Sequence, residues 1–296
     1  MEQRRNVLKG LAGGGVLWAA TGVPVRARAP FESSRIVVET RGAGPDLILI
    51  PGLASTSSVW SRVASRLAGQ RLHLVSVRGF GDLPPAANRE GAIMGAVAGE
   101  VRRYIAETGL ERPAVIGHSM GGQIGLRVAA DAPDRVGRLM TVDASPFFPA
   151  LISPGATVGD VEPIAQVAYQ AIQILGDEGL RARGRALGLE LGGAADAVFG
   201  SMGWQGGDRR VLAQALYEVM TVDLRHRLPD ISAPVTVVYG WSPDESSPRS
   251  RTDSLFRGAY ASLPRPAVFE RIEGAEHMVM IDQPTRFLAA VERFLA

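Results

Sequence analysis

Residues 115–124, which read Val-Ile-Gly-His-Ser-Met-Gly-Gly-Gln-Ile, constrain the fold of this 296-residue chain more than any other stretch. A short β-branched run leads into Gly-x-Ser-x-Gly, and a helical run follows from Ile124. A serine at a sharp corner between a strand and a helix has a strained backbone that raises its hydroxyl above the sheet. Glycines two positions before and after it avoid collisions there, and the helix points its positive end at the serine. The pattern predicts that Ser119 is a nucleophile.

This pattern resembles the nucleophile elbow of the α/β-hydrolase family, and the resemblance extends over residues 35–296. Further along the chain, apolar strand-like runs alternate with helical runs, which favours a parallel sheet. We therefore expect an α/β fold with a doubly wound, mostly parallel sheet. From residue 147 to about 229, helical stretches follow one another with no strand between them. The resemblance implies that these residues form a helical cap inserted after the sixth strand, over the substrate site.

The N-terminus is not expected to belong to this fold. Arg4 and Arg5 are followed by Val7, Leu8 and Lys9, and then by a short apolar, glycine-rich run. This arrangement resembles a twin-arginine (Tat) export signal, and the apolar run is too short to span a membrane as a helix. We interpret residues 1–29 as a signal peptide and residues 30–296 as the hydrolase domain, with cleavage after residue 27 or 29. The resemblance implies a partner, the Tat export machinery, and a periplasmic or secreted location in bacteria.

Composition and motif content exclude several kinds of chemistry. The chain has no cysteine, so a disulfide, a thiolate metal site and a cysteine nucleophile are ruled out. Its formal net charge is only +2, and the basic N-terminal residues account for this excess, so no nucleic-acid partner is expected. No histidine and aspartate cluster has metal-ligand spacing, and no dinucleotide or phosphate-binding fingerprint occurs. We expect neither a metal nor a cofactor.

A serine nucleophile needs a general base, and the chain offers four histidines. His118 adjoins Ser119 and is expected to point away from it. His73 lies near the start of a predicted strand, far from the edge where ligands bind, and His226 lies at the end of the cap. His277 follows the last predicted strand and fits the family order of serine, acid and histidine. His277 is therefore the predicted base.

The carboxylate that orients this histidine has two candidate positions. In the family it usually follows the strand predicted at residues 235–239, about three residues after a glycine. Here Pro243 stands at that position, and Asp244 and Glu245 come next. The second position is the end of the preceding strand, where Asp143 lies. Asp244 is the preferred acid and Asp143 the alternative, while Glu245 and the absence of any acid stay open.

The loop after residues 47–50 reads Pro51-Gly52-Leu53, and by resemblance its Leu53 N–H and the Met120 N–H form the oxyanion hole. A serine at the elbow indicates acyl transfer through an acyl-enzyme. We expect a small-molecule acyl substrate, with carboxylic ester hydrolysis as the first hypothesis. Lactonase, thioesterase, C–C hydrolase, aminopeptidase and cofactor-free perhydrolase activities use the same groups, and an inactive ligand-binding protein is the alternative from another class. The oligomeric state stays open.

Overall fold

The computed structural model describes residues 30–186, 203–243 and 248–296 of the chain. The predicted signal peptide, residues 1–29, lies outside the described residues. Residues 31–296 form one compact unit built on a seven-stranded sheet, whose order is β1-β3-β2-β4-β5-β6-β7. Only β1 is antiparallel to its neighbour, so the described sheet is mostly parallel, as the sequence predicts. The strands are β1 (Ile36–Arg41), β2 (Asp46–Ile50), β3 (Arg71–Val77), β4 (Ala114–His118), β5 (Arg138–Val142), β6 (Val235–Trp241) and β7 (Val268–Glu273).

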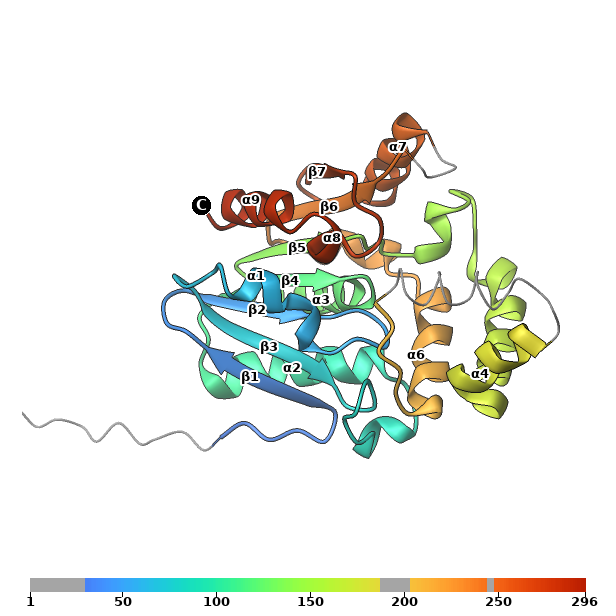
Figure 1. The fold of residues 1–296 in the computed structure, drawn as a ribbon. Coiled ribbons are helices and arrows are strands. Elements are labelled where there is room, and N and C mark those ends of the chain that lie inside the picture. The colour runs from blue at the N-terminus through green and yellow to red at the C-terminus, as the bar shows by residue number, and fades with distance from the viewer. Residues whose placement is uncertain (1–29, 187–202, 244–247) are drawn as a thin grey trace, which may run out of the picture. The chain divides into compact units, whose positions relative to one another are not determined.

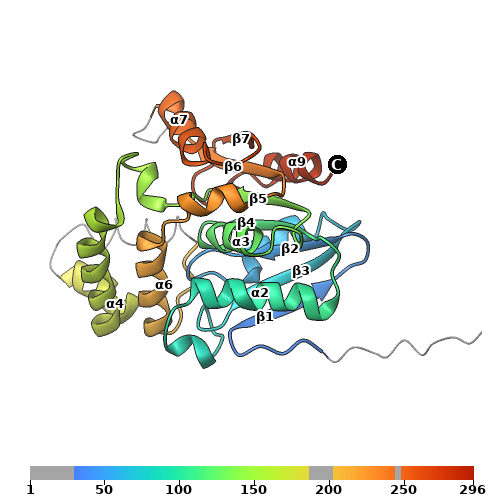
Figure 2. The ribbon, with the colours of Figure 1, turned by 180° about the vertical axis from the view of Figure 1, so that it is seen from behind.

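Helices cover both faces of this sheet (Figures 1 and 2). The helices α2, α3 and α7 contribute to the apolar core on one face, and α1, α8 and α9 to the core on the other. Successive strand residues alternate between these two cores, as Leu47 and Ile48 do in β2, because side chains in a strand point to opposite faces. These helices are α1 (Ser61–Ala64), α2 (Met94–Thr108), α3 (Met120–Asp131), α7 (Arg249–Ala259), α8 (Val279–Asp282) and α9 (Pro284–Leu295). Both faces are buried, which explains the continuous apolar runs of the central strands.

The helical insertion follows β5, which is the fifth described strand along the chain. The expectation that it follows the sixth strand is wrong, because only five stretches of strand composition precede it. The insertion contains η3 (Phe148–Leu151), α4 (Val158–Ala186), α6 (Arg209–Thr221) and η4 (Arg225–Asp230). Helix α4 packs on α6, and its axis breaks at Gly176, where φ is +66°. Two further short helices are η1 (Ser57–Trp60) and η2 (Ala86–Arg89).

A buried carboxylate ties the cap to the start of α2. Glu218 of α6 is 6% exposed, and its two oxygens accept hydrogen bonds from the backbone N–H groups of Ile93 (2.7 Å) and Met94 (2.8 Å). The first N–H groups of a helix have no partner within the helix, and the helix dipole favours a negative charge beside them. Glu218 therefore stabilises the N-terminus of α2 from another element.

Replacing Glu218 with alanine should lower the free energy of unfolding by about 2–4 kcal/mol, because two buried N–H groups lose a charged acceptor. Urea denaturation of the purified protein measures this loss. Glu162→Ala is the matched control: this exposed cap glutamate accepts a hydrogen bond only from the Tyr217 hydroxyl among the described contacts, and its replacement should cost less than about 0.5 kcal/mol. Equal effects of the two changes would contradict the capping role.

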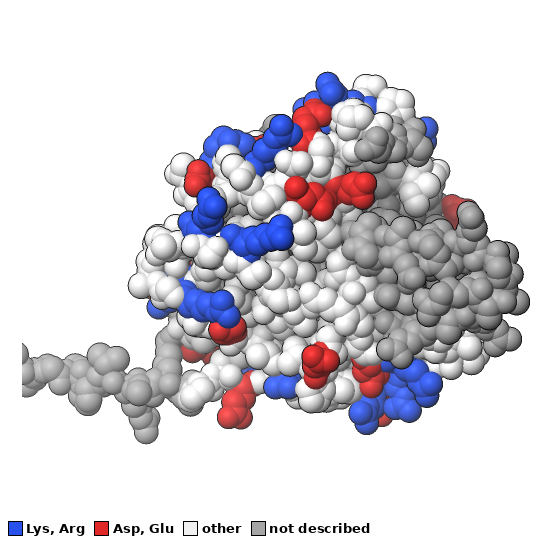
Figure 3. All heavy atoms as spheres, in the orientation of Figure 1, with Lys and Arg blue, Asp and Glu red and all other residues white. Residues whose placement is uncertain are grey.

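Charges of both signs are mixed on the surface. Figure 3 shows arginine and acidic side chains interspersed around one face of the molecule. Many of the described arginines are paired with carboxylates, as Arg293 is with Glu270 and Arg71 with Asp46. Such pairs leave no broad field of one sign on the visible part of this face. Among the described residues, no helix combines the length and the apolarity that crossing a membrane requires.

Candidate active site

Ser119 occupies the corner between β4 and α3. Its backbone has φ +51° and ψ −121°. This conformation is unfavourable for any residue that has a side chain, and it persists only where the surrounding structure imposes it. Its N–H donates to the carbonyl of Val142 on the neighbouring strand β5 (2.9 Å). Its carbonyl accepts from the N–H groups of Gly122 (2.8 Å) and Gln123 (3.2 Å). The elbow expected from the sequence is therefore present at Ser119.

The glycine two residues after the serine is required by a close approach of two backbones. A Cβ atom on Gly121 would lie 2.3 Å from the carbonyl oxygen of Ile50 and 2.5 Å from that of Pro51. No side chain fits at such distances, so the start of α3 can pack against the end of β2 only with glycine here.

The loop after β2 lies directly against the serine. A Cβ atom on Gly52 would be 3.2 Å from Cβ of Ser119, and Leu53 follows Gly52 in the chain. Met120 is the first residue of α3, so its N–H has no acceptor within the helix. The structure thus brings the Leu53 loop, the Met120 N–H and Ser119 together, as the oxyanion-hole prediction requires. Leu53 and Met120 are both buried, and a polarised oxygen held there would be shielded from water.

The structure places Asp143 against His277. The distance from Oδ2 of Asp143 to Nδ1 of His277 is 2.6 Å, and the two side chains are 19% and 20% exposed. β4 and β5 are paired up to His118 and Val142, so Ser119 and Asp143 are the next residues on two neighbouring strands. Among the described residues, Asp143, the alternative acid of the sequence analysis, is therefore the carboxylate that is hydrogen-bonded to the predicted base.

Two further hydrogen bonds of Asp143 itself, and one of the residue after it, hold Asp143 in place. Its N–H donates to the carbonyl of Val238 (2.8 Å), and its Oδ1 accepts from the N–H of Gly240 on β6 (3.2 Å). Its backbone has φ +45°, a left-handed conformation that Asp tolerates better than most residues. The buried hydroxyl of Tyr260 donates to the carbonyl of Ala144 (2.9 Å), the residue after Asp143. These contacts fix one carboxylate oxygen and leave the other for His277.

The preferred acid, Asp244, and the further candidate Glu245 lie outside the described residues. The Gly240 that precedes them has a different partner, because its N–H donates to Asp143. One feature of the sequence favours Asp143 over the later candidates. Asp143 comes directly after a buried strand that is adjacent to the elbow strand, where carboxyl ends of parallel strands meet.

Two of the other histidines lie away from the serine, as expected. His73 is buried in β3, where its ring bonds the Tyr104 hydroxyl (2.7 Å) and the Asp46 carboxylate (2.8 Å), and burial lowers its pKa. His226 lies in η4 and is exposed. Neither is described as hydrogen-bonded to a carboxylate at the carboxyl edge of the sheet, as His277 is.

His118 has a position that the sequence analysis missed. It is fully buried, its ring centroid lies 4.6 Å from that of His277, and its Nε2 lies 2.9 Å from the His277 carbonyl oxygen. Since a carbonyl can only accept, Nε2 carries the proton. Burial first, and the neighbouring His277 second, hold the pKa of His118 well below its usual range. His118 is thus a neutral donor that supports the backbone of the predicted base.

This lowered pKa predicts a loss of stability in mild acid. An unfolded histidine titrates near pH 6.5, so below that pH the unfolded chain binds a proton that folded His118 does not. The free energy of unfolding should then fall with falling pH, by up to about 1.4 kcal/mol per pH unit for this site. Urea denaturation between pH 7.5 and 5.5 measures the slope, and His118→Gln should make it shallower. His73 contributes with the same sign, so some slope should persist; an unchanged slope would contradict the assignment.

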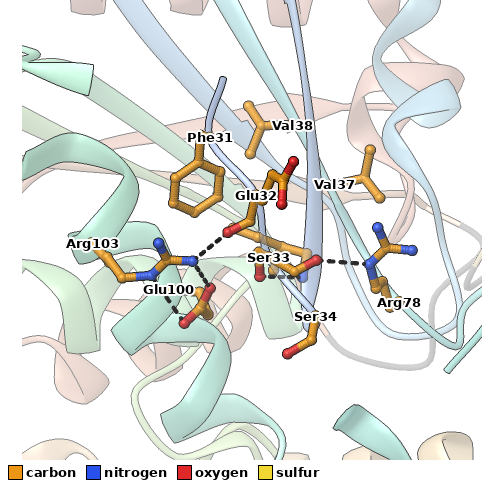
Figure 4. A pocket seen from close by; sticks show the side chains of 10 residues that line it. Phe31, Glu32, Ser33, Ser34, Val37, Val38, Arg78, Glu100 and Arg103 are labelled. Carbon is orange, nitrogen blue, oxygen red and sulfur yellow. Dashed lines mark hydrogen bonds and ion pairs between the residues drawn. The ribbon is translucent and has the colours of Figure 1, made fainter. Parts of the chain in front are cut away.

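A cavity of about 680 Å³ lies away from this constellation, against β1 and α2 (Figure 4). It is lined by residues between Phe31 and Val38 together with Arg78, Glu100 and Arg103, and neither Ser119 nor His277 is among them. The Arg103 guanidinium donates to the carbonyl of Glu32 (2.6 Å) and lies over the ring of Phe31, while Arg78 donates to the carbonyl of Ser33 (3.0 Å). At this cavity, residues 31–33 are therefore held against the rest of the domain by Arg103 and Arg78.

The arrangement can perform acyl transfer. It combines a serine on an elbow, the start of α3 and the loop after β2 beside it, and a histidine hydrogen-bonded to a carboxylate, which are the parts that nucleophilic catalysis by serine requires. Within the described ranges, no group of three or more His, Asp or Glu side chains is arranged to hold a metal ion.

Comparison with known proteins decides the family. The α/β hydrolase fold model matches residues 45–166. A pimeloyl-(acyl-carrier protein) methyl ester esterase of Aeromonas hydrophila is 30% identical over 281 residues, covering 88% of this chain and 99% of the relative. The chain belongs to the α/β-hydrolase fold family. The esterase of the same name from Aeromonas salmonicida is 31% identical, with the same coverage of both chains. As a member of this family with the parts described above, the protein is a hydrolase.

Solved structures agree with the fold. An enol-lactonase from Burkholderia xenovorans has a TM-score of 0.65 at 19% identity, with 88% of this chain and 96% of that chain covered. A thermophilic esterase from Thermogutta terrifontis has a TM-score of 0.65 at 22% identity, with 88% and 92% covered. At these identities the α/β-hydrolase likeness concerns the architecture, and the predicted fold class is confirmed.

Proposed function

We propose that this protein hydrolyses carboxylic esters through an acyl-enzyme on Ser119, with His277 as general base and Asp143 as its acid. The single observation that carries this proposal is the 2.6 Å hydrogen bond between Asp143 and Nδ1 of His277, at the same edge of the sheet as the elbow serine. The bond directs the proton of neutral His277 to Nδ1 and leaves Nε2 free to accept the serine proton.

The reaction follows from these positions. Oγ of Ser119 attacks the ester carbonyl carbon as His277 takes its proton, and the N–H groups of Leu53 and Met120 hold the oxyanion that forms. Collapse of this intermediate breaks the C–O bond to the alcohol, which leaves with the proton from His277. Water then attacks the acyl-enzyme with His277 again as base, and the carboxylic acid is released. Asp143 stabilises the imidazolium in both halves of the reaction.

The relatives suggest the kind of leaving group. Both Aeromonas relatives are named as methyl ester esterases, and each is covered over 99% of its length. We therefore propose short alkyl esters, methyl esters first, as substrates of this chain. The acyl-carrier protein belongs to the relatives' name alone, and the substrate proposed for this chain is a free small ester.

A fluorophosphonate probe tests the catalytic serine. We expect the purified protein to be labelled once, on the tryptic peptide that contains Ser119, and Ser119→Ala to remain unlabelled. Release of equal amounts of methanol and acid from methyl esters, followed by chromatography, tests the ester substrate. Absence of labelling in the unmodified protein would overturn the serine mechanism. Labelling with turnover of lactones or thioesters, but of no alkyl ester, would overturn the choice of substrate.

We also propose that the protein is exported by the twin-arginine route and acts in the periplasm or outside the cell. The support is the Arg4-Arg5 sequence and the anchoring of the chain from Phe31 onward, so cleavage after residue 27 or 29 would leave every described anchor in the mature protein. Changing Arg4→Lys and Arg5→Lys together should leave the precursor in the cytoplasm, as cell fractionation would show. Unchanged export of this variant would refute the route.

A further inference from the structure

Residues 203–208, here called the strap, lead into α6 and join the cap to the loops that carry the proposed site (Figure 1). The strap contacts the loop after β2, because the Ser55 hydroxyl donates to the carbonyl of Gly203 (2.8 Å). It also contacts the loop after β3, because the Asp208 N–H donates to the carbonyl of Gly79 (2.8 Å). The strap is therefore held at the carboxyl edge of the sheet by hydrogen bonds to the loops after β2 and β3.

The strap also reaches the loop that carries the proposed base. A Cβ atom on Gly203 would lie 2.4 Å from Cε and 2.8 Å from Sδ of Met278, the residue after His277. The strap thus passes directly over Met278, and glycine permits this approach. One short segment of the cap touches both the loop of the predicted oxyanion donor Leu53 and the loop of the predicted base.

Gln205 of the strap makes four described hydrogen bonds, and all four go to the loop after β2 and the start of η1. Its N–H donates to the carbonyl of Ala54 (2.7 Å). Its side-chain Oε1 accepts from the N–H (3.0 Å) and the hydroxyl (2.8 Å) of Thr56, and its Nε2 donates to the hydroxyl of Ser58 (2.9 Å). Gln205 therefore bonds three residues of a five-residue stretch that follows Leu53 directly.

The stretch that Gln205 holds has a conformation that needs support. Ala54 has φ +54°, in the left-handed region that residues with a Cβ atom rarely adopt. Such a residue persists only where its surroundings determine it, and here the Ala54 carbonyl is fixed by the Gln205 N–H. Ala54 follows Leu53 directly, so the path of the chain as it leaves Leu53 depends on this turn.

We infer that Gln205 is a positioning residue for the oxyanion hole: from the cap, it holds the loop after β2 so that the Leu53 N–H faces the oxyanion. This inference rests on the proposed acyl-enzyme mechanism. Gln205 acts through Leu53 and touches neither the substrate nor the reacting atoms. An oxyanion donor contributes mainly in the transition state, so its displacement lowers kcat and leaves KM nearly unchanged.

Two variants test the inference on the full-length mature protein. Gln205→Ala removes the side-chain bonds to Thr56 and Ser58, and Gln205→Met removes them while nearly keeping the length of the side chain. We expect kcat for a methyl ester to fall by about tenfold to a hundredfold in both, less than the loss of a whole donor. KM should change less than about twofold, because binding of the substrate in its ground state does not depend on the displaced N–H. Gln173→Ala, a cap glutamine whose amide bonds Tyr169 within α4, is the matched control and should keep kcat.

A trifluoromethyl ketone inhibitor distinguishes a displaced oxyanion donor from a general loss of stability of the protein. Ser119 adds to its carbonyl, and the hemiketal oxygen becomes an anion in the oxyanion hole. Its affinity should fall in parallel with kcat in both Gln205 variants, while the binding of the carboxylic acid product and the thermal midpoint should stay close to those of the unmodified protein. Unchanged kcat and unchanged ketone affinity would overturn the inference, and so would a rise in KM alone. Failure of the unmodified protein to react with the fluorophosphonate probe would instead overturn the proposed function, so the two failures are distinguishable.

Discussion

Asp143→Asn is expected to lower kcat for ester hydrolysis by about four orders of magnitude, the effect of removing the charge behind a catalytic histidine. The asparagine side chain has nearly the size of the aspartate, so the 2.6 Å contact to Nδ1 of His277 can be kept. It carries no charge, however, and its amide can turn an N–H toward the ring. His277 then favours the wrong tautomer, and its imidazolium loses its neighbouring anion. Steady-state kinetics on a short alkyl ester measures the loss.

Asp244→Asn is the matched control for this change, since Asp244 was the preferred acid from the sequence. We expect the kcat of this variant to remain within about threefold of that of the unmodified protein, as for a residue that is not one of the proposed catalytic residues. Circular dichroism should show both variants folded. The opposite result, with activity lost in Asp244→Asn and kept in Asp143→Asn, would transfer the acid role to the loop after β6.

Ser119→Ala is expected to lower kcat by about six orders of magnitude, because no acyl-enzyme can form without the nucleophile. The residual rate over water would come from the oxyanion donors and from substrate binding alone. The backbone at this position, with φ +51°, is unfavourable for alanine and serine alike, so the fold should change little. The thermal midpoint should accordingly lie close to that of the unmodified protein.

Ser242→Ala serves as the control for the loss of a serine hydroxyl, since Ser242 is buried after β6 and has no part in the proposed reaction. We expect less than about a threefold change in its kcat. Retention of ester hydrolysis by Ser119→Ala, in a preparation free of contaminating esterase, would show that another group is the nucleophile.

The sheet and the elbow could be predicted because local signals determine them. Residues 47–50 and 115–117 are apolar runs that suit only strands buried on both faces, and glycine at position 121 is required by the 2.3 Å approach to Ile50. The choice of His277 among four histidines also followed from local position, since only His277 comes after a strand at the correct edge. The contact with Asp143 agrees with that choice.

The partner of the histidine and the function of the strap depend on contacts between distant segments. Asp143 and His277 are 134 residues apart, and which of several carboxylates approaches the ring depends on how β5, β6 and β7 are placed side by side. Gln205 lies 149 residues from Thr56 and has no motif around it. The interaction of His118 with the His277 carbonyl likewise joins residues 159 apart, and no local pattern predicts it.

The position of Asp143 has a consequence for how this enzyme can diversify. If the serine and the acid stand at the ends of the adjacent strands β4 and β5, the connection from β6 to α7, residues 242–248, carries no part of the reaction. Insertions and deletions in a connection that carries no catalytic group should then be tolerated. This connection is thus the natural place to randomise sequence or to graft a loop when a new ester specificity is sought.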